Sequence, residues 1–173
     1  MSWRRLLPPR RRRSARVVLL DPDRRVLLFR QTSTGDLPDS PYWYLPGGGI
    51  LPFESIEAAA RRELREETGI CEAAFGPVIG ERPEVSFLFR GRRIVQDEWY
   101  VAGCVPTPHV GTGRHGDGEA RAVEAHRWWA IEELVATGER VFPPGLDTLV
   151  RAAAGWVAGQ PGNPTLPRNS TVD

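Results

Sequence analysis

The sequence predicts a mixed domain of the α/β or α+β class, built on a mixed β-sheet. Short apolar stretches typical of strands outnumber the helical patterns, and the helical patterns are interspersed among them. The chain has 173 residues, which is enough for one domain with a hydrophobic core and too few for two. No repeat and no linker divides its middle part.

The two ends of the chain differ from the middle in composition. Residues 1–13 contain six arginines and no acidic residue, which predicts a flexible basic arm. Residues 159–173 are polar and rich in turn formers, which predicts a flexible tail. We therefore expect one folded domain over residues 14–158. The arm is either a solvated tail or a segment that attracts phosphate or nucleic acid.

Composition narrows the classes of partner and compartment. The net charge of +1 gives the whole molecule no strong field for nucleic acid or a membrane, so neither is an expected partner. No apolar stretch approaches the roughly 20 residues of a membrane span. The two cysteines, Cys71 and Cys104, match no CxxC pattern and no disulfide framework. This usage favours a reducing, cytoplasmic compartment.

The N-terminal part of the domain is predicted to form a hairpin and a short strand. Apolar runs at Ala15–Leu20 and Val26–Phe29 flank a turn with the sequence Asp-Pro-Asp, as in two paired strands. Tyr42–Leu45 predicts a short strand that leads into Gly47–Gly49. Three glycines in a row let the backbone approach a ligand closely, so we expect this loop to lie at a binding site.

A helix is predicted at Glu54–Thr68, because this segment is rich in Ala, Glu, Arg and Leu and is followed by Gly69, a common C-terminal cap. At helical spacing, Glu63, Glu66 and Glu67 share one face, where like charges repel. Either the neighbouring arginines neutralise them on a wet surface, or a hard cation such as Mg²⁺ gathers their oxygens. The preceding glycine loop favours the cation, since a helix N-terminus also attracts phosphate.

The rest of the domain is predicted to add strands and two helices. The strand patterns are Ala74–Glu81, Glu84–Phe89, Ile94–Val105 and Ala125–Ile131. The helical patterns are Glu132–Thr137 and Leu146–Ala158, the second of which follows a Pro-Pro-Gly sequence.

Residues 48–70 carry a complete family motif. Gly48, Glu54, Arg62-Glu63-Leu64, Glu66-Glu67 and Gly69-Ile70 resemble the Nudix box, G-x5-E-x7-R-E-U-x-E-E-x-G-U, where U is a bulky aliphatic residue. Its seven fixed identities would coincide by chance with a probability on the order of 10⁻⁹ per window. The motif is therefore specific, although it covers only 23 residues.

The resemblance implies an α/β/α sandwich with a curved mixed sheet and a loop–helix–loop formed by the box. It also implies hydrolysis of a nucleoside diphosphate linked to another moiety, with Mg²⁺, or alternatively Mn²⁺, as the cofactor. Homodimerisation is common in the family and is an expectation by analogy. Many relatives carry Glu and Gly where this chain has Leu51 and Phe53, which predicts an altered loop shape.

The resemblance also implies roles for individual residues. Glu54 is expected to support the metal shell beside the substrate, Arg62 to orient a box glutamate, and Gly48 and Gly49 to lie against substrate phosphates. The expected metal ligands are the carbonyl of Gly47 and the carboxylates of Glu63, Glu66 and Glu67.

The general base is left open between the box and later segments. Family members use a box glutamate, here Glu66 or Glu67, or an acid on a later loop. The later candidates, all of which have surface positions as the alternative, are Glu124, Glu119, Asp97 and Glu98. Arg30 and Arg82 are candidates for contacts with phosphate or ribose, and one or two of the aromatic residues are candidates to stack on a nucleobase.

The sequence therefore predicts a metal-dependent pyrophosphohydrolase that acts on a nucleotide-type small molecule, foremost a nucleoside triphosphate. ADP-ribose or another nucleotide sugar is the alternative substrate. A nucleotide-sensing module without turnover is the alternative from another class.

Overall fold

The computed structural model describes residues 8–31, 41–89, 92–111 and 123–160. Its strands are β1 (Arg10–Leu20), β2 (Val26–Gln31), β3 (Tyr42–Tyr44), β4 (Gly47–Gly49), β5 (Ala74–Phe89), β6 (Arg92–Cys104), β7 (Val123–Trp129) and β8 (Arg140–Phe142). Its helices are α1 (Ile56–Thr68), α2 (Ile131–Ala136) and α3 (Leu146–Ala158). None of the helices in these ranges is long and apolar enough to cross a membrane.

The strands form one mixed sheet, as the sequence predicted. The order is β5-β6-β1-β2-β3-β8, while β4 pairs with β1 and β7 pairs with β2. The central pair, β1 and β6, is parallel over the whole length of β1, whereas β1 runs antiparallel to β2 and β4. As a result, β1 contacts both the glycine strand β4 and the long strand β6.

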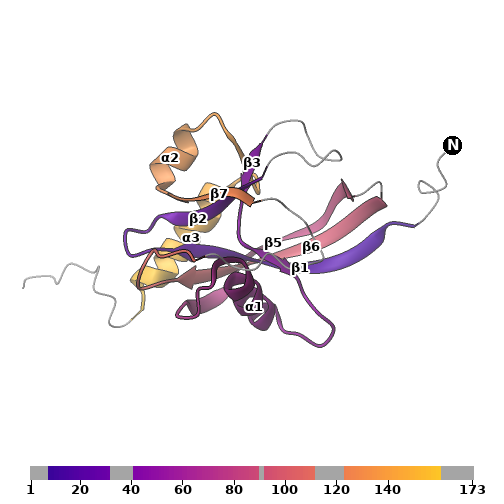
Figure 1. Ribbon diagram of the computed structural model, residues 1–173, viewed down its shortest axis with the longest axis horizontal. Coiled ribbons are helices and arrows are strands. Elements are labelled where there is room, and N and C mark those ends of the chain that lie inside the picture. The colour runs from indigo at the N-terminus through magenta and orange to yellow at the C-terminus, as the bar shows by residue number, and fades with distance from the viewer. Residues whose placement is uncertain (1–7, 32–40, 90–91, 112–122, 161–173) are drawn as a thin grey trace, which may run out of the picture.

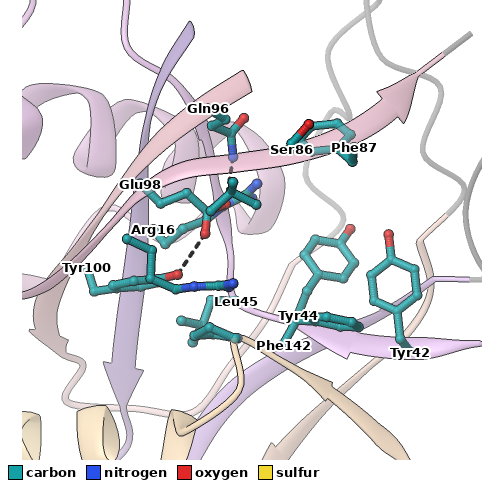
Figure 2. Close-up of a pocket in the computed structure, with 13 residues that line it drawn as sticks. Arg16, Tyr42, Tyr44, Leu45, Ser86, Phe87, Gln96, Glu98, Tyr100 and Phe142 are labelled. Atoms are coloured by element: carbon teal, nitrogen blue, oxygen red, sulfur yellow. Dashed lines mark hydrogen bonds and ion pairs between the residues drawn. The ribbon is translucent and has the colours of Figure 1, made fainter. Parts of the chain in front are cut away.

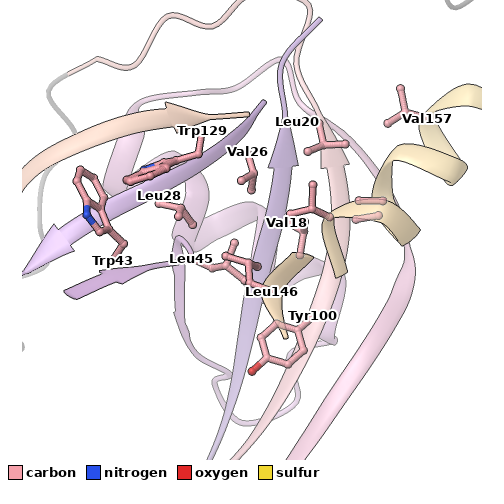
Figure 3. Close-up of a cluster of buried hydrophobic side chains, with 13 residues drawn as sticks. Val18, Leu20, Val26, Leu28, Trp43, Leu45, Tyr100, Trp129, Leu146 and Val157 are labelled. Atoms are coloured by element: carbon pink, nitrogen blue, oxygen red, sulfur yellow. The ribbon is translucent and has the colours of Figure 1, made fainter. Parts of the chain in front are cut away.

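Helices cover both faces of the curved sheet (Figure 1), which gives the expected sandwich. Helix α1 buries Ala59, Ala60 and Leu64, which pack against residues of β1, β2 and β6 such as Val17. On the opposite face, α3 packs its buried side chains on a second core cluster that includes Tyr100 and Trp129 (Figure 3). Most buried positions on each helix are three or four residues apart, which places them on one face and explains this one-sided packing.

Helix α1 ends where the sequence predicted, but it begins later than predicted. Gly69 caps the C-terminus with φ of 72°, and its N–H donates to the Arg65 carbonyl at 2.8 Å. The N-terminal cap is Ser55, whose Oγ accepts from the Ala58 N–H at 3.1 Å. Glu54 therefore precedes the helix instead of lying in its first turn, and its carboxylate is free to fold back over the box.

Two other predicted boundaries were wrong. Strand β1 begins at Arg10, so the last four arginines of the expected arm lie in the sheet, paired with β6; residues 1–7 lie outside the described ranges. The two strands expected before and after Pro83 are one strand, β5, with register shifts along it. An edge strand tolerates proline because one row of its N–H groups has no partner strand.

Candidate active site

The glycine strand and the acidic face of α1 lie against each other. A carboxylate oxygen of Glu67 accepts a hydrogen bond from the Gly47 N–H at 2.8 Å. A Cβ built on Gly48 would lie 2.6 Å from the carboxylate carbon of Glu63, so any larger residue would displace that carboxylate. The predicted loop–helix association is therefore present, and it brings the glycine strand next to two box carboxylates.

Arg62 holds this arrangement together. Its guanidinium makes two hydrogen bonds to the Glu54 carboxylate, at 2.8 and 2.9 Å, and one to the Gly49 carbonyl at 2.8 Å. The same group contacts Glu63 at 2.7 Å and Glu66 at 3.4 Å. The hydrogen bonds from Arg62 hold the pKa of Glu54 below its ordinary value. The expected pairing of Arg62 with a box glutamate is thus seen, with Glu54 as an additional partner that accepts two hydrogen bonds.

The donor set fits a hard divalent cation. Glu63, Glu66 and Glu67 lie on successive turns of α1 and offer only carboxylate oxygens, beside the backbone of Gly47. Within the described ranges, no three acidic, histidine or cysteine side chains form a group that could hold a metal by themselves. Mg²⁺ commonly keeps waters and takes further oxygens from substrate phosphate, so an incomplete set of side chains suits that ion.

Burial makes Glu63 sensitive to pH. Desolvation holds the pKa of Glu63 above its ordinary value of 4.5, although Arg62 acts in the opposite direction. A carboxyl group with a raised folded-state pKa stabilises the fold at low pH, and this contribution is lost as the pH rises through the folded-state pKa. The ionised form that a metal would need is therefore the form that destabilises the metal-free protein.

We expect Glu63→Gln to increase the free energy of unfolding at neutral pH when no metal is added. The neutral amide avoids the cost of a buried charge, so the gain should vanish as the pH falls below 4.5, where the carboxyl group of the wild type is itself neutral. Urea unfolding with chelator at several pH values measures the effect. A variant less stable than the wild type at pH 7 would show that the pairing with Arg62 outweighs burial.

A cavity of about 300 Å³ lies on the other side of β1 from α1. Its polar floor is formed by β1 and β6: Glu98 accepts hydrogen bonds from the Tyr100 hydroxyl at 2.7 Å and from the Gln96 amide at 2.6 Å (Figure 2). Burial and the adjacent Glu98 raise the pKa of Tyr100, so its hydroxyl is a donor at physiological pH. Arg16 also lies in the floor.

Aromatic side chains form the walls of the cavity. Tyr42 and Tyr44 of β3 and Phe142 of β8 lie on one side, and Phe87 of β5 lies across from them (Figure 2). The Tyr42 and Phe142 rings meet edge to face, with centroids 5.4 Å apart. Aromatic walls around a floor of hydrogen-bonding groups suit a flat, polar ligand of the size of a nucleobase.

Arg16 joins the cavity to the glycine strand. Its guanidinium Nη1 donates to the Gly47 carbonyl at 2.7 Å, and its Nε lies 3.7 Å from a carboxylate oxygen of Glu98. The carbonyl expected to bind metal therefore already has a cationic neighbour, which sequence reasoning did not anticipate. Gln96 and Tyr42 were also missed, because the motif gives no information about residues on other strands.

The other predicted site residues lie in different parts of the structure, and only some of them line the cavity. Arg82 lines the cavity, and its contact with a substrate stays a prediction. Arg30 is not among the cavity-lining residues; its guanidinium lies over the Trp43 ring, 5.9 Å from the centroid. Asp97 accepts from the Glu84 N–H and points away from the cavity floor, unlike Glu98. Glu119 and the side chain of Glu124 lie outside the described residues.

The family model of the NUDIX domain matches residues 10–148 of the chain. The chain belongs to the NUDIX family. It is 46% identical over 148 residues to an RNA pyrophosphohydrolase of Caulobacter vibrioides, covering 78% of this chain and 79% of the relative. It is 32% identical over 118 residues to the CTP pyrophosphohydrolase of Escherichia coli, covering 68% and 75% of the two chains.

Solved structures of NUDIX proteins share the fold. A MutT protein from Methanosarcina mazei aligns with a TM-score of 0.57 at 21% identity, covering 87% of this chain and 97% of the other. The NUDIX domain of Shewanella oneidensis NrtR, solved with ADP ribose, aligns with a TM-score of 0.60 at 18% identity, covering 87% and 92%. These likenesses confirm the sandwich fold. With the family match over residues 10–148, the protein is a Nudix hydrolase.

Proposed function

We propose that this Nudix protein hydrolyses a pyrophosphate bond of nucleoside triphosphates with Mg²⁺, for which Mn²⁺ can substitute. One observation carries the proposal: an aromatic cavity of about 300 Å³ lies across β1 from the acidic helix, and Arg16 reaches from the cavity to the Gly47 carbonyl of the glycine strand. A base in the cavity would bring its phosphates close to Arg16, whose guanidinium contacts the Gly47 carbonyl.

The chemistry is the addition of water to phosphorus with cleavage of a P–O–P bridge. A bound divalent ion would neutralise phosphate charge and favour ionisation of the attacking water. Gly47, Glu63, Glu66 and Glu67 would hold it, and Arg62 orients Glu63. Among the glutamates that contact Arg62, Glu66 has the most exposed side chain, at 44%. Its carboxylate oxygen lies 3.4 Å from the Arg62 guanidinium, a weak contact. Both features favour Glu66 as the group that accepts the proton of the water.

A second substrate is favoured by the relatives. The Caulobacter protein, which covers most of this chain at 46% identity, is named an RNA pyrophosphohydrolase. A triphosphate at the 5′ end of RNA presents the same reactive group as a free nucleotide. The low net charge argued against a nucleic-acid partner, but a site that binds only the terminal nucleotide needs no extended basic surface.

A substrate panel tests the proposal. We expect turnover of one or more nucleoside triphosphates, or of a 5′-triphosphate RNA oligonucleotide, with Mg²⁺, and loss of turnover with excess EDTA that Mg²⁺ restores. Chromatography of the products distinguishes loss of pyrophosphate from stepwise loss of phosphate. Cleavage of ADP-ribose alone would replace the proposed substrate by a nucleotide sugar, and no turnover in the whole panel would refute the proposal.

A further inference from the structure

Arg16 is a buried cation placed between two sites. Only 8% of the residue is exposed, and it emerges from β1 between the floor of the cavity and the glycine strand. Burial disfavours a charged guanidinium, but the carboxylates of Glu98 and Glu67 outweigh it and raise the pKa of Arg16. The charge is therefore permanent, and one negative partner lies on the cavity side and the other on α1.

Several bonds besides the one from Arg16 hold the backbone at Gly47 in place. Gly47 has φ of 130°, its N–H is bound by Glu67, and it pairs with β1 in the sheet. The preceding carbonyl, of Pro46, accepts from the Val17 N–H at 2.9 Å. Because the backbone is held by these bonds, removing the Arg16 side chain would leave the carbonyl in place and change mainly its electrostatic surroundings.

A guanidinium and a divalent ion at one carbonyl oxygen affect each other. The oxygen has two lone pairs, so it can serve both, but two cations that share it repel at close range in a site with little water. Arg16 is therefore expected to weaken metal binding at Gly47. A ligand in the cavity that attracts the guanidinium would relieve this repulsion, because Arg16 also lines the cavity.

We propose that Arg16 is a positioning residue that couples the cavity to the metal site. Without a nucleotide, its guanidinium and the metal share the Gly47 carbonyl. A nucleotide in the cavity draws the guanidinium toward itself. The inference rests on the proposed function, since it takes the cavity as the nucleotide site. Its consequence is that the metal is held firmly only together with a nucleotide. By thermodynamic linkage, the metal must strengthen nucleotide binding by the same factor by which the nucleotide strengthens metal binding.

The test is a titration with Mn²⁺ alone, read by the electron paramagnetic resonance of the free ion. We expect Arg16→Met, which keeps much of the apolar stem but loses the charge, to bind Mn²⁺ about tenfold more tightly than the wild type. Arg16→Lys keeps the charge and should stay within about threefold of the wild type. A role of Arg16 in packing alone predicts the opposite order, with weaker binding in Arg16→Met.

A second titration adds a saturating nucleoside 5′-monophosphate. We expect the nucleotide to raise Mn²⁺ affinity by a larger factor in the wild type than in Arg16→Met. If Arg16→Met does not fold, the double variant Arg16→Met/Glu98→Gln takes its place in the same measurements, because it removes both charges of the buried pair. Thermal unfolding of each variant verifies the fold.

The inference is overturned if the variant without the charge binds Mn²⁺ no more tightly than the wild type, or if the nucleotide changes the affinity equally in both proteins. Neither titration involves turnover. A wild type that binds Mn²⁺ but hydrolyses no triphosphate would thus contradict the proposed function alone, whereas unchanged affinities in an active enzyme would contradict the coupling alone.

Discussion

Glu67→Gln is expected to lower kcat by about a thousandfold or more with little loss of stability. An amide oxygen can still accept the hydrogen bond from the Gly47 N–H, now 2.8 Å from the carboxylate, so the loop should stay in place. What the variant loses is the negative charge that a divalent cation needs from α1. A metal contributes several kcal/mol to stabilising charge in the transition state, and a thousandfold corresponds to about 4 kcal/mol.

Steady-state kinetics on the preferred triphosphate, with Mg²⁺ varied up to tens of millimolar, measure this effect. The matched control is Glu57→Gln, because Glu57 lies on the same helix but is exposed and pairs only with Arg61, at 2.9 Å. Losing such a surface pair costs at most about 1 kcal/mol of stability, and activity should be unchanged. If Glu67→Gln kept more than a tenth of the wild-type kcat, Glu67 would not be a metal ligand that catalysis needs.

The contrast between Glu67 and Arg16 shows what can be predicted from the sequence. The acidic face and the glycine loop were predictable because they lie within 23 consecutive residues, where helical spacing alone places the carboxylates on one face. Arg16 lies more than 30 residues before the box, in a strand whose apolar pattern predicts only a buried core strand. Its contact with Gly47 exists because β4 pairs with β1, and no local signal specifies that pairing.

The cavity was hidden for the same reason. Its floor and walls come from five strands, β1, β3, β5, β6 and β8, and the three-residue strand β8 was not predicted at all. The parallel pairing of β1 with β6 sets Arg16 beside Tyr100, although 84 positions separate them in the chain. Sequence patterns predicted the acidic helix and the glycine strand, whereas the residues around the cavity depend on the order of strands in the sheet.

Gly47→Ala is expected to destabilise the protein by about 3 kcal/mol or more. Gly47 has φ of 130°, a region that residues with a side chain rarely adopt. A Cβ there would also run into the carbonyl oxygen of Ala15 and lie 2.9 Å from the Cα of Arg16. Both obstacles are backbone atoms of the central strand, so the clash can be relieved only by separating β4 from β1.

The neighbouring glycines provide matched controls that separate stability from activity. A Cβ on Gly49 would meet nothing within 4 Å, so Gly49→Ala should stay within about 0.5 kcal/mol of the wild type. A Cβ on Gly48 would displace only the flexible end of Glu63, so Gly48→Ala should fold but lose activity. Urea unfolding and kcat measured on all three variants test this order.

Equal stability of the three variants would mean that β4 does not pack on β1 as described, and the shared carbonyl of Gly47 would lose its structural basis. The opposite outcome, with Gly47→Ala alone unfolding early, would show that the carbonyl is anchored by the sheet. An anchored carbonyl is the condition under which Arg16 acts on the metal through charge and not by moving the ligand. The stability of one glycine variant thus decides how the effect of the Arg16 variants on Mn²⁺ binding is to be interpreted.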